Sequence, residues 1–341
     1  LHYPLRRQRQ MCIRDRDIIR KISLFTNVER RAVISAYDVK TTIYEIPLIF
    51  HEQKLDEIVL EKLQLKSKKA KLDNWSNMVD KIKNAEKTLT IGIVGKYIDL
   101  HDSYKSIYEA LTHGGIAHKT KIELKKIDSE LFESSQEPAE LLRDVDAMLI
   151  PGGFGQRGIE GMIRAARYAR EKGLPTFGIC LGMQIMVIEY GRHVLGLSEA
   201  DSTEFSPSTP HPIISLLEEQ VDVKMYGGTM RLGRSETVLQ ENTHIRRSYG
   251  KNIVYERHRH RYEVNNQYRQ QLKDAGLIIS GITPEGALVE SVEWPEHPWG
   301  VGVQFHPEFT STPIQPHPLF VGFVKAGLEH AGKAVSKGDE V

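Results

Sequence analysis

The sequence predicts an α/β fold: a mostly parallel open sheet with helices on both faces and with antiparallel additions. Between residues 88 and 196, apolar strand-like runs alternate with helix-like runs, which is typical of parallel sheets covered on both faces. Between residues 221 and 306 the pieces shorten, which indicates antiparallel additions and one last strand that delivers "FHPEF". Such sheets bind ligands beyond the carboxyl ends of their strands, where the glycine loops of this sequence fall.

The elements of the alternating region follow from their apolar periodicity and from the positions of glycine. Gly173 suits the residue that ends a helix, because glycine readily adopts the left-handed backbone conformation found there. Two of the expected strands end in glycine turns, "PGGFG" and "GICLG". Strands are expected at 89–97, 121–128, 145–155 and 174–180, and helices at 103–111, 159–173 and 181–196.

The residues before this region predict three further parts. The basic stretch 1–16 has no apolar period, and we interpret it as a disordered or non-native leader. Residues 17–65 combine strand-like pieces at 32–35 and 43–46 with an amphipathic run at 51–65, too little to close a core, so they resemble the end of a larger domain. The lysine-rich residues 66–87 suit an exposed linker or a surface helix, and 88–341 form the main domain.

Composition excludes several classes of protein. The chain of 341 residues carries 46 Lys and Arg against 45 Asp and Glu, a net charge of +1, so neither nucleic acid nor an anionic membrane is an expected partner. No apolar run approaches the roughly 20 residues of a membrane span, and no signal peptide opens the chain. With only two cysteines, Cys12 and Cys180, a disulfide scaffold and a four-cysteine zinc site are excluded. A reducing cytoplasm is the expected location.

The stretch "TFGICLGMQ" at 176–184 places Cys180 between two glycines where a strand meets a helix. The cysteine could be a small buried hydrophobe, half of a disulfide, a metal ligand or a nucleophile. A sharp strand-to-helix turn crowds the side chains two residues away, so Gly178 and Gly182 suit a nucleophile elbow. The helix N-terminus favours the thiolate, and the N–H of Leu181 points where a substrate oxyanion would form.

The segments "FHPEF" and "PGGFG" supply what a thiolate needs to cleave an amide. The leaving nitrogen must be protonated, and the group that does this must be oriented. His306 and Glu308 lie two residues apart at a strand end and so are expected on one face of it. Adjacent glycines allow backbone angles closed to other residues, so the N–H groups of Gly153 and Leu181 are the expected oxyanion donors.

Each of these signals has an ordinary interpretation when it is taken alone. A cysteine at a strand end is usually a small buried hydrophobe, a His-x-Glu pair is usually a solvated loop, and a Gly-Gly pair is usually a turn. Because all three end predicted strands of one parallel sheet, together they favour the nucleophile. The stretch "HRHR" at 257–260 is similarly open to interpretation as a basic surface cluster or a metal site; without a nearby carboxylate or cysteine, zinc is disfavoured, and we assign no metal.

In this order and spacing the three segments resemble the triad-type glutamine amidotransferase family, which has a flavodoxin-like sheet, hydrolyses the side-chain amide of glutamine and passes the ammonia to a partner site. The flanking segments resemble the CTP synthase family within it, over roughly residues 20–330. These segments are "GIVGKYIDLHDSYKSIYEALTHGG" at 92–115, "STEF" at 202–205, "GGTMRLG" at 227–233, "ERHRHRYEVNN" at 256–266 and "HPWGVGVQFHPEFTSTP" at 297–313.

The resemblance implies a site for L-glutamine without any cofactor of its own. Cys180 would be the acylated nucleophile, completed by His306 and Glu308. Glu204 and Arg261 would hold the α-amino and α-carboxylate groups, a choice that suits a free amino acid because arginine can meet a carboxylate with two hydrogen bonds. The rest of the pocket would be lined by Gly153, Leu181, Gly182, Met183 and Gln184.

The resemblance also implies nucleotide partners and a homotetramer. "KISLF" and "AVISAYDV" resemble the end of the synthetase domain, where Lys21 would touch the pyrimidine nucleotide (UTP or CTP) and Tyr37, Asp38 and Val39 would touch ATP. In the family the ammonia attacks ring position 4 of UTP, activated by ATP and Mg²⁺, and GTP is an activator. Candidates for the GTP contact are Phe154, Arg157 and Glu160.

One departure from the family limits the expected activity. No phosphate-binding G-x-x-x-x-G-K-[ST] loop occurs, and "GIVGK" at 92–96 lacks its spacing. The chain is therefore expected to hydrolyse glutamine at best and not to make CTP alone. Two rival functions remain open: a thiol hydrolase of the same fold that acts on γ-glutamyl or peptide substrates, and a non-catalytic regulatory module whose triad is a relic.

Overall fold

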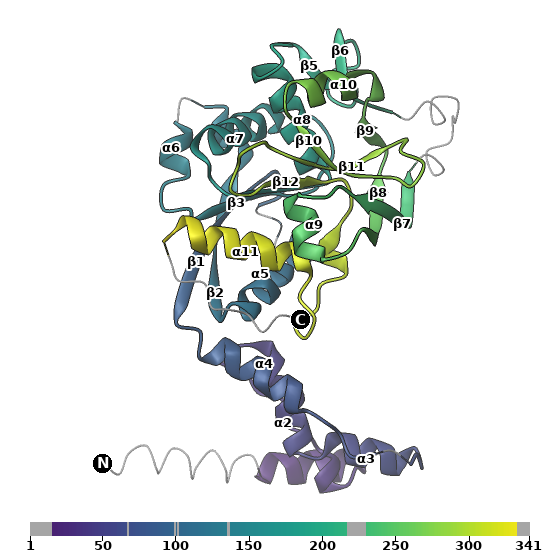
Figure 1. Cartoon of the computed structure of the whole chain (residues 1–341). Coiled ribbons are helices and arrows are strands. Elements are labelled where there is room, and N and C mark those ends of the chain that lie inside the picture. Colours follow the sequence, from purple (N-terminus) through teal and green to yellow (C-terminus); the bar gives the residue numbers. More distant parts are fainter. Residues whose placement is uncertain are drawn as a thin grey trace. The chain divides into compact units, whose positions relative to one another are not determined.

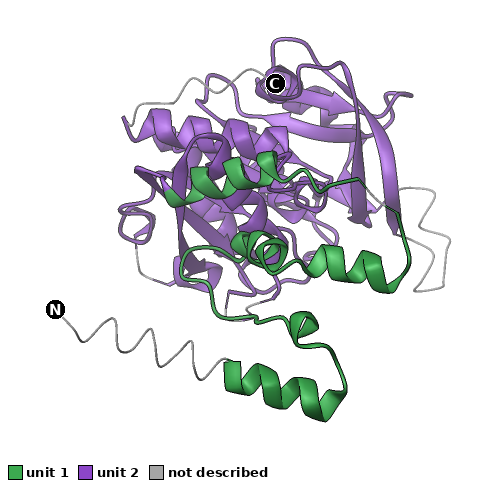
Figure 2. Cartoon of the chain, turned by 90° about the horizontal axis from the view of Figure 1, so that it is seen from below, with its two compact units in different colours: residues 1–83 green, residues 84–341 purple. Residues whose placement is uncertain are grey.

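The chain divides into two compact units, residues 1–83 and 84–341, which Figure 2 colours separately. The computed structural model describes residues 16–66, 68–98, 100, 102–134, 137–216 and 230–332. Of the leader predicted at 1–16, all but residue 16 therefore lies outside the described residues, as does most of the strand-like piece predicted at 221–233.

The first unit is helical where it is regular. Residues 16–26 form a helix, and the predicted linker contains α4. The amphipathic run at 51–65 is helical as predicted, but a left-handed Lys54 (φ 60°) separates α2 from α3. The elements are η1 (Arg30–Ala32), η2 (Ile43–Glu45), α2 (Ile46–Glu52), α3 (Leu55–Lys62) and α4 (Asp73–Lys83).

The two strands predicted in this unit, at 32–35 and 43–46, were wrong. The second is the turn η2, which Thr42 caps by accepting a hydrogen bond from the N–H of Tyr44 at 3.3 Å. In the first, Ser35 exchanges two hydrogen bonds with the side chain of Gln53 instead of pairing with a strand. Apolar runs this short do not distinguish a strand from an irregular buried segment.

The second unit is built on a nine-stranded sheet in the order β2-β1-β3-β4-β12-β11-β10-β7-β8. The pairs from β2 to β12 are parallel, in the 2-1-3-4-5 order of flavodoxin-like folds. The pairs from β12 to β8 are antiparallel, so the predicted fold class is confirmed. The strands are β1 (Lys87–Gly95), β2 (Thr120–Asp128), β3 (Ala147–Ile150), β4 (Thr176–Ile179), β7 (Arg231–Leu239), β8 (Ile253–His260), β10 (Ile278–Ile282), β11 (Val289–Glu293) and β12 (Gly300–Val303).

Helices cover both faces of this sheet, with α5 and α11 on one and α7 and α8 on the other (Figure 1). Alternate residues of β3 enter the two apolar cores: Met148 packs on the α7 and α8 side, Leu149 on the α5 and α11 side. None of the described helices is long and apolar enough to cross a membrane. The helices are α5 (Lys105–Ala117), α6 (Pro138–Leu141), α7 (Ile159–Lys172), α8 (Leu181–His193), α9 (His244–Tyr249), α10 (Asn266–Asp274) and α11 (Pro318–His330), with the turns η3 (Ser129–Phe132) and η5 (Pro307–Phe309).

The carboxyl ends of three neighbouring parallel strands, β3, β4 and β12, carry the three segments singled out in the sequence. Gly173 ends α7 in the left-handed conformation (φ 65°), as predicted. A second, three-stranded sheet, β5 (Ala200–Ser202), β6 (His211–Leu216) and β9 (Tyr262–Val264), adjoins α8. These elements bring the candidate site together.

Candidate active site

Cys180 occupies a strained turn between β4 and α8. Its backbone has φ 53° and ψ −102°, which a non-glycine residue rarely adopts and which costs about 1–3 kcal/mol. The turn is possible because its neighbours lack side chains: a Cβ on Gly182 would lie 2.1 Å from the carbonyl oxygen of Ile150, and one on Gly178 would lie 2.7 Å from Gly182. The thiol is thus held at the N-terminus of α8.

His306 and Glu308 are joined by a hydrogen bond of 2.7 Å between Nδ1 and Oε1. The prediction that the two residues share one face of a strand was wrong. β12 ends at Val303, and Pro307 turns the chain into η5, in which Glu308 lies. The strand has therefore ended before either residue, and the two side chains meet through a turn.

The charge state of His306 follows from its two partners. Burial lowers the pKa of the imidazole, but the hydrogen bonds and charges of Cys180 and Glu308 outweigh burial and raise the pKa to about 10. His306 therefore carries a proton at neutral pH. With Nδ1 engaged by the carboxylate, Nε2 remains to face the sulfur.

The glycine loop after β3, residues 151–155, can approach the neighbouring side chains closely because its glycines carry no side chain. Gly152 and Gly153 do not have a positive φ, contrary to the expectation; the positive φ in this segment begins at Gly155 (77°). A Cβ on Gly152 would lie 3.1 Å from Cε1 of His306, and one on Gly153 would lie 3.2 Å from Cδ2 of Leu181. The glycines let the loop approach the triad closely.

Lys96, directly after β1, was assigned no role from the sequence, yet its side chain hydrogen-bonds to this loop. Its ammonium group donates to the carbonyl oxygens of Phe154, at 3.1 Å, and of Gly155. Burial lowers the pKa of Lys96 to about 8, against the opposing charge of Glu204. The "GIVGK" segment could have signalled this, because a lysine that directly follows a buried strand end points toward the neighbouring loops.

A cavity of about 350 Å³ opens at the sulfur. Six of the residues that line it were singled out in the sequence: Gly153, Phe154, Cys180, Gln184, Glu204 and Arg261. Three were not: Met230, His260 and Tyr262. The other predicted lining residues pack behind it. Gly182 contacts β3, Met183 lies against Gly302 of β12, and the side chain of Leu181 lies under Gly153.

The cavity presents one carboxylate and one guanidinium. Burial raises the pKa of Glu204, while the N–H of Gly155, which donates to Oε1 at 2.8 Å, and the charges of Lys96 and Arg261 oppose that rise. A ligand that has both an ammonium and a carboxylate group matches this pair of opposite charges. The arrangement suits a free α-amino acid.

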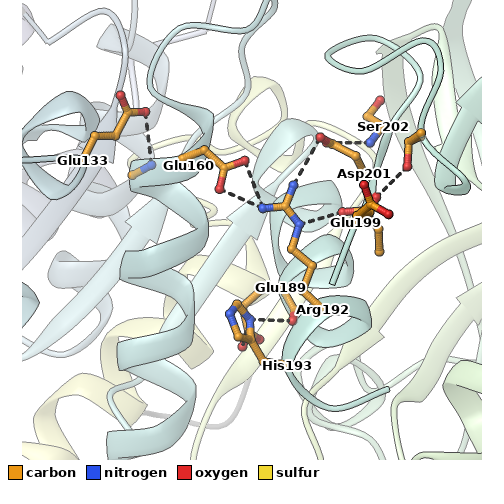
Figure 3. A network of polar contacts seen from close by, with 11 residues as sticks. Glu133, Glu160, Glu189, Arg192, His193, Glu199, Asp201 and Ser202 are labelled. Atoms are coloured by element: carbon orange, nitrogen blue, oxygen red, sulfur yellow. Dashed lines mark hydrogen bonds and ion pairs between the residues drawn. The ribbon is translucent and has the colours of Figure 1, made fainter. Parts of the chain in front are cut away.

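The segment that carries Glu204 is held by Arg192 of α8 (Figure 3). The guanidinium contacts Glu160 of α7 at 2.7 Å and Asp201 of β5 at 3.2 Å. Asp201 accepts the N–H of Ser202, whose hydroxyl in turn accepts the N–H of Glu204 at 3.1 Å. A chain of polar contacts thus runs from α7 to the backbone of Glu204, whose carboxylate lines the cavity.

Two glutamines connect the sulfur to the far wall of the cavity. Gln304 donates from Nε2 to Sγ of Cys180 at 3.7 Å and accepts from Gln184 at 3.2 Å. Gln184 also donates to the carbonyl of Tyr262 at 2.9 Å. Gln304 was missed in the sequence, although its place two residues before His306 at the end of β12 was a usable signal.

The remaining candidates lie apart from the cavity, except for Phe154, which is half exposed at its edge. Arg157 contacts Glu130 at 3.2 Å, and Glu160 is engaged by Arg192. The four nucleotide candidates belong to the first unit: Lys21 is exposed on helix 16–26, and Tyr37, Asp38 and Val39 follow one another in irregular chain.

The "HRHR" stretch is not a uniformly basic surface cluster, because its two histidines face inward. His258 and His260 alternate inward on β8 and are buried, while Arg257 and Arg259 point outward. Carboxylates do lie near the histidines, contrary to the expectation, because β9 and β11 bring them from elsewhere in the chain. Among the described residues, no three His, Cys, Asp or Glu side chains are grouped to hold a metal ion.

Comparison with known proteins decides the family. The model of the family described as glutamine amidotransferase class-I matches residues 99–326, two thirds of the chain. The chain belongs to the class-I glutamine amidotransferase family. A second family model, CTP synthase N-terminus, matches residues 5–65 of the chain.

Similar proteins narrow the resemblance to CTP synthases, as predicted from the sequence. CTP synthase of Geobacillus kaustophilus is 52% identical to this chain, over 91% of this chain and 58% of the relative's own length. CTP synthase of Aquifex aeolicus is 48% identical to this chain, over 95% of this chain and 61% of the relative's own length. A Trypanosoma brucei CTPS glutaminase domain with bound acivicin is 38% identical, with a TM-score of 0.67 over 72% of this chain and 95% of that one. The chain thus spans about three fifths of the curated relatives' length.

Proposed function

We propose that this chain hydrolyses L-glutamine to L-glutamate and ammonia. The observation that carries the proposal is the convergence of Cys180, His306 and Glu308 beside a cavity that also holds Glu204 and Arg261. A thiolate, a protonated imidazole and an orienting carboxylate can cleave an amide. The two charged side chains select a free amino acid.

The proposed first half of the reaction acylates the cysteine. The sulfur of Cys180 attacks the carboxamide carbon, and the N–H groups of Gly153 and Leu181 stabilise the oxyanion. Leu181 is the first residue of α8, and an N–H in the first turn has no acceptor within its own helix. The C–N bond then breaks, its electron pair goes to nitrogen, and His306 donates the proton that makes ammonia.

The second half regenerates the enzyme. His306, now neutral, takes a proton from a water molecule as the water attacks the thioester carbon. The C–S bond breaks, glutamate leaves, and the proton on the imidazole again faces the thiolate. Glu308 orients the imidazole in both halves and stabilises its charged form.

We further propose that the ammonia serves amination of UTP at ring position 4, with ATP and Mg²⁺, as the resemblance to CTP synthases implies. Support comes from the relatives' names and from the CTP synthase N-terminus match at residues 5–65. Lys21, Tyr37, Asp38 and Val39 are the proposed nucleotide contacts. In this proposal the chain contributes the glutaminase half, acts in the cytoplasm and assembles as a homotetramer.

GTP is the proposed activator, and the rim of the cavity is its proposed site. Phe154 is half exposed there, while Arg157 and Glu160 lie on the segment that follows and make ion pairs with Glu130 and Arg192. Binding of a nucleotide to Arg157 would compete with Glu130. GTP is expected to raise the rate of glutamine hydrolysis without being consumed.

The test is ammonia release from glutamine, from γ-glutamyl dipeptides and from unrelated amides. We expect hydrolysis of glutamine and its loss in Cys180→Ala, with little loss of thermal stability because the side chain is small. Activity on γ-glutamyl peptides but not on glutamine would favour a different thiol hydrolase. No activity on any substrate, with no labelling of Cys180 by a diazoketone analogue of glutamine, would support a non-catalytic module.

A further inference from the structure

Five ionisable side chains form a closed circuit at the wall of the proposed glutamine cavity, which one of them, His260, also lines. Arg231 on β7 lies 2.6 Å from Glu290 on β11, which lies 3.5 Å from His258 on β8. His258 is hydrogen-bonded to His260 at 3.0 Å, and His260 lies 3.6 Å from Glu263 on β9. Glu263 closes the circuit at 3.6 Å from Arg231.

The circuit is buried, so its charges must nearly balance. The side chains of both glutamates and both histidines are at most 2% exposed, and that of Arg231 is 16% exposed. One cation faces two carboxylates. Because an uncompensated charge is costly in a protein interior, such a group takes up a proton instead. One added proton makes the circuit neutral.

The protonation of the members agrees with this count. Burial, with the charge of Arg231, lowers the pKa of His258 to about 2 and that of His260 to about 3, so both are neutral. Burial raises the pKa of Glu263 to about 8, against the charge of Arg231. It raises the pKa of Glu290 as well. The added proton therefore sits on a carboxylate at neutral pH.

The circuit surrounds the bend that carries Arg261. β8 ends at His260 and β9 begins at Tyr262, so Arg261 is the single residue between the two sheets. The circuit holds this bend on both sides, through His260 and Glu263. Arg231 also fixes its neighbour Met230, which lines the same cavity. A change in the circuit is transmitted to the substrate-facing wall.

We propose that this buried circuit positions Arg261 for the α-carboxylate of glutamine and does so only while it holds its one added proton. The proposal rests on glutamine hydrolysis as the function. Arg231, His258, Glu263 and Glu290 are positioning residues, because they act on the substrate through Arg261; His260 also lines the cavity. Loss of the proton leaves a net negative charge behind the carboxylate site, and that charge opposes binding of an anionic group.

The direction of the pH effect follows from the charges that face the circuit. These are Arg231 and the histidines within it, and His306, whose charge reaches both histidines. His306 keeps its proton up to about pH 10, so between pH 7 and pH 9 two groups change charge: the circuit, which loses its proton, and Lys96, whose pKa is about 8. Loss of the Lys96 charge is common to the wild type and the circuit variants, so it cancels when they are compared. KM for glutamine is expected to rise across that interval, while kcat changes less.

The experiment measures kcat and KM for glutamine from pH 6.5 to 9 in four proteins: the wild type, Glu263→Gln, Arg231→Gln and the control Glu236→Gln. Glutamine at position 263 mimics the protonated carboxyl, so the circuit can no longer lose its proton. Glu236 lies on β7 too, but it is exposed and bonded to Tyr255. Deprotonation of the substrate's own amine is common to all four proteins and cancels in the comparison.

We expect the ratio of KM at pH 9 to KM at pH 7 to be at least threefold smaller in Glu263→Gln than in the wild type and the control. Arg231→Gln is expected to raise KM about tenfold at pH 7 with kcat within threefold. Equal KM ratios in Glu263→Gln and the wild type would overturn the circuit proposal while leaving glutamine hydrolysis intact. A wild type that releases no ammonia from glutamine would instead overturn the proposed function, and the circuit proposal with it.

Discussion

The carboxylate of Glu308 gives the most quantitative test of the triad. The pKa of His306 is about 10 against an ordinary 6.5, a difference worth about 5 kcal/mol at about 1.36 kcal/mol per unit. Burial opposes this rise, so Cys180 and Glu308 together supply more than that. If the two contribute equally, Glu308 stabilises the imidazolium by about 2–3 kcal/mol. Glu308→Gln keeps the shape of the side chain and removes that contribution.

The expected result is a fall of about 30- to 100-fold in kcat/KM for glutamine, since about 1.36 kcal/mol corresponds to a tenfold change in rate. The pH profile is expected to change as well. Activity falls at high pH when His306 loses its proton, and in the variant this fall is expected about 2 pH units lower than in the wild type. Ammonia release between pH 6 and 10 measures both. The matched control is Glu123→Gln, which changes an exposed glutamate side chain on β2.

Thermal stability gives an independent check with a definite sign. A histidine whose folded pKa is raised stabilises the fold fully below its unfolded pKa and loses that contribution as the pH rises through its folded pKa. The melting temperature of the wild type is therefore expected to fall between pH 6.5 and 10, and that of Glu308→Gln to fall less. A variant within threefold of wild-type kcat/KM at every pH, with an unchanged stability profile, would refute the reasoning.

Three further substitutions test the walls of the site. Arg261→Ala removes the guanidinium that we expect to meet the α-carboxylate, so KM for glutamine should rise at least about tenfold; an unchanged KM would remove Arg261 from the site. Gly182→Ala places a methyl group 2.1 Å from the oxygen of Ile150, and should cost at least about 1–3 kcal/mol in the free energy of unfolding together with most activity. A wild-type melting temperature would show that the turn tolerates a side chain. Arg192→Gln breaks the contacts with Glu160 and Asp201 and should raise KM several-fold with kcat little changed; a loss confined to kcat would contradict its role in holding Glu204.

The sequence was sufficient for the parallel half of the fold, because three of its five strands, β1, β3 and β4, are apolar runs that lead into a glycine turn. It also predicted that the three candidate segments lie at the carboxyl ends of neighbouring strands, and β3, β4 and β12 do bring them together. The local geometry was harder to predict. His306 and Glu308 were expected on a strand, but β12 ends at Val303, before either residue, and Glu308 lies in the turn η5, which begins at Pro307.

The buried circuit could not have been predicted from one sequence. Its members come from β7, β8, β9 and β11, and no local period links Arg231 to Glu290. The alternation in "HRHR" did indicate one inward face, but whether that face meets solvent, a metal or carboxylates depends on which strands pair with β8. Pairing between antiparallel strands of distant sequence is a tertiary property, so short strands carry little information about it.

The most direct test of the account is to trap the acyl-enzyme. Glutamine is mixed with the protein, the reaction is quenched in acid within milliseconds to seconds, and peptide mapping by mass spectrometry locates any γ-glutamyl group. A thioester on the peptide that contains Cys180, absent from the peptide that contains Cys12, is the predicted result. It is expected to form far more slowly when His306 is replaced by glutamine, because that variant lacks the proton donor for the departing ammonia. Continued ammonia release with no modification of Cys180, or in the Cys180→Ala variant, would contradict it.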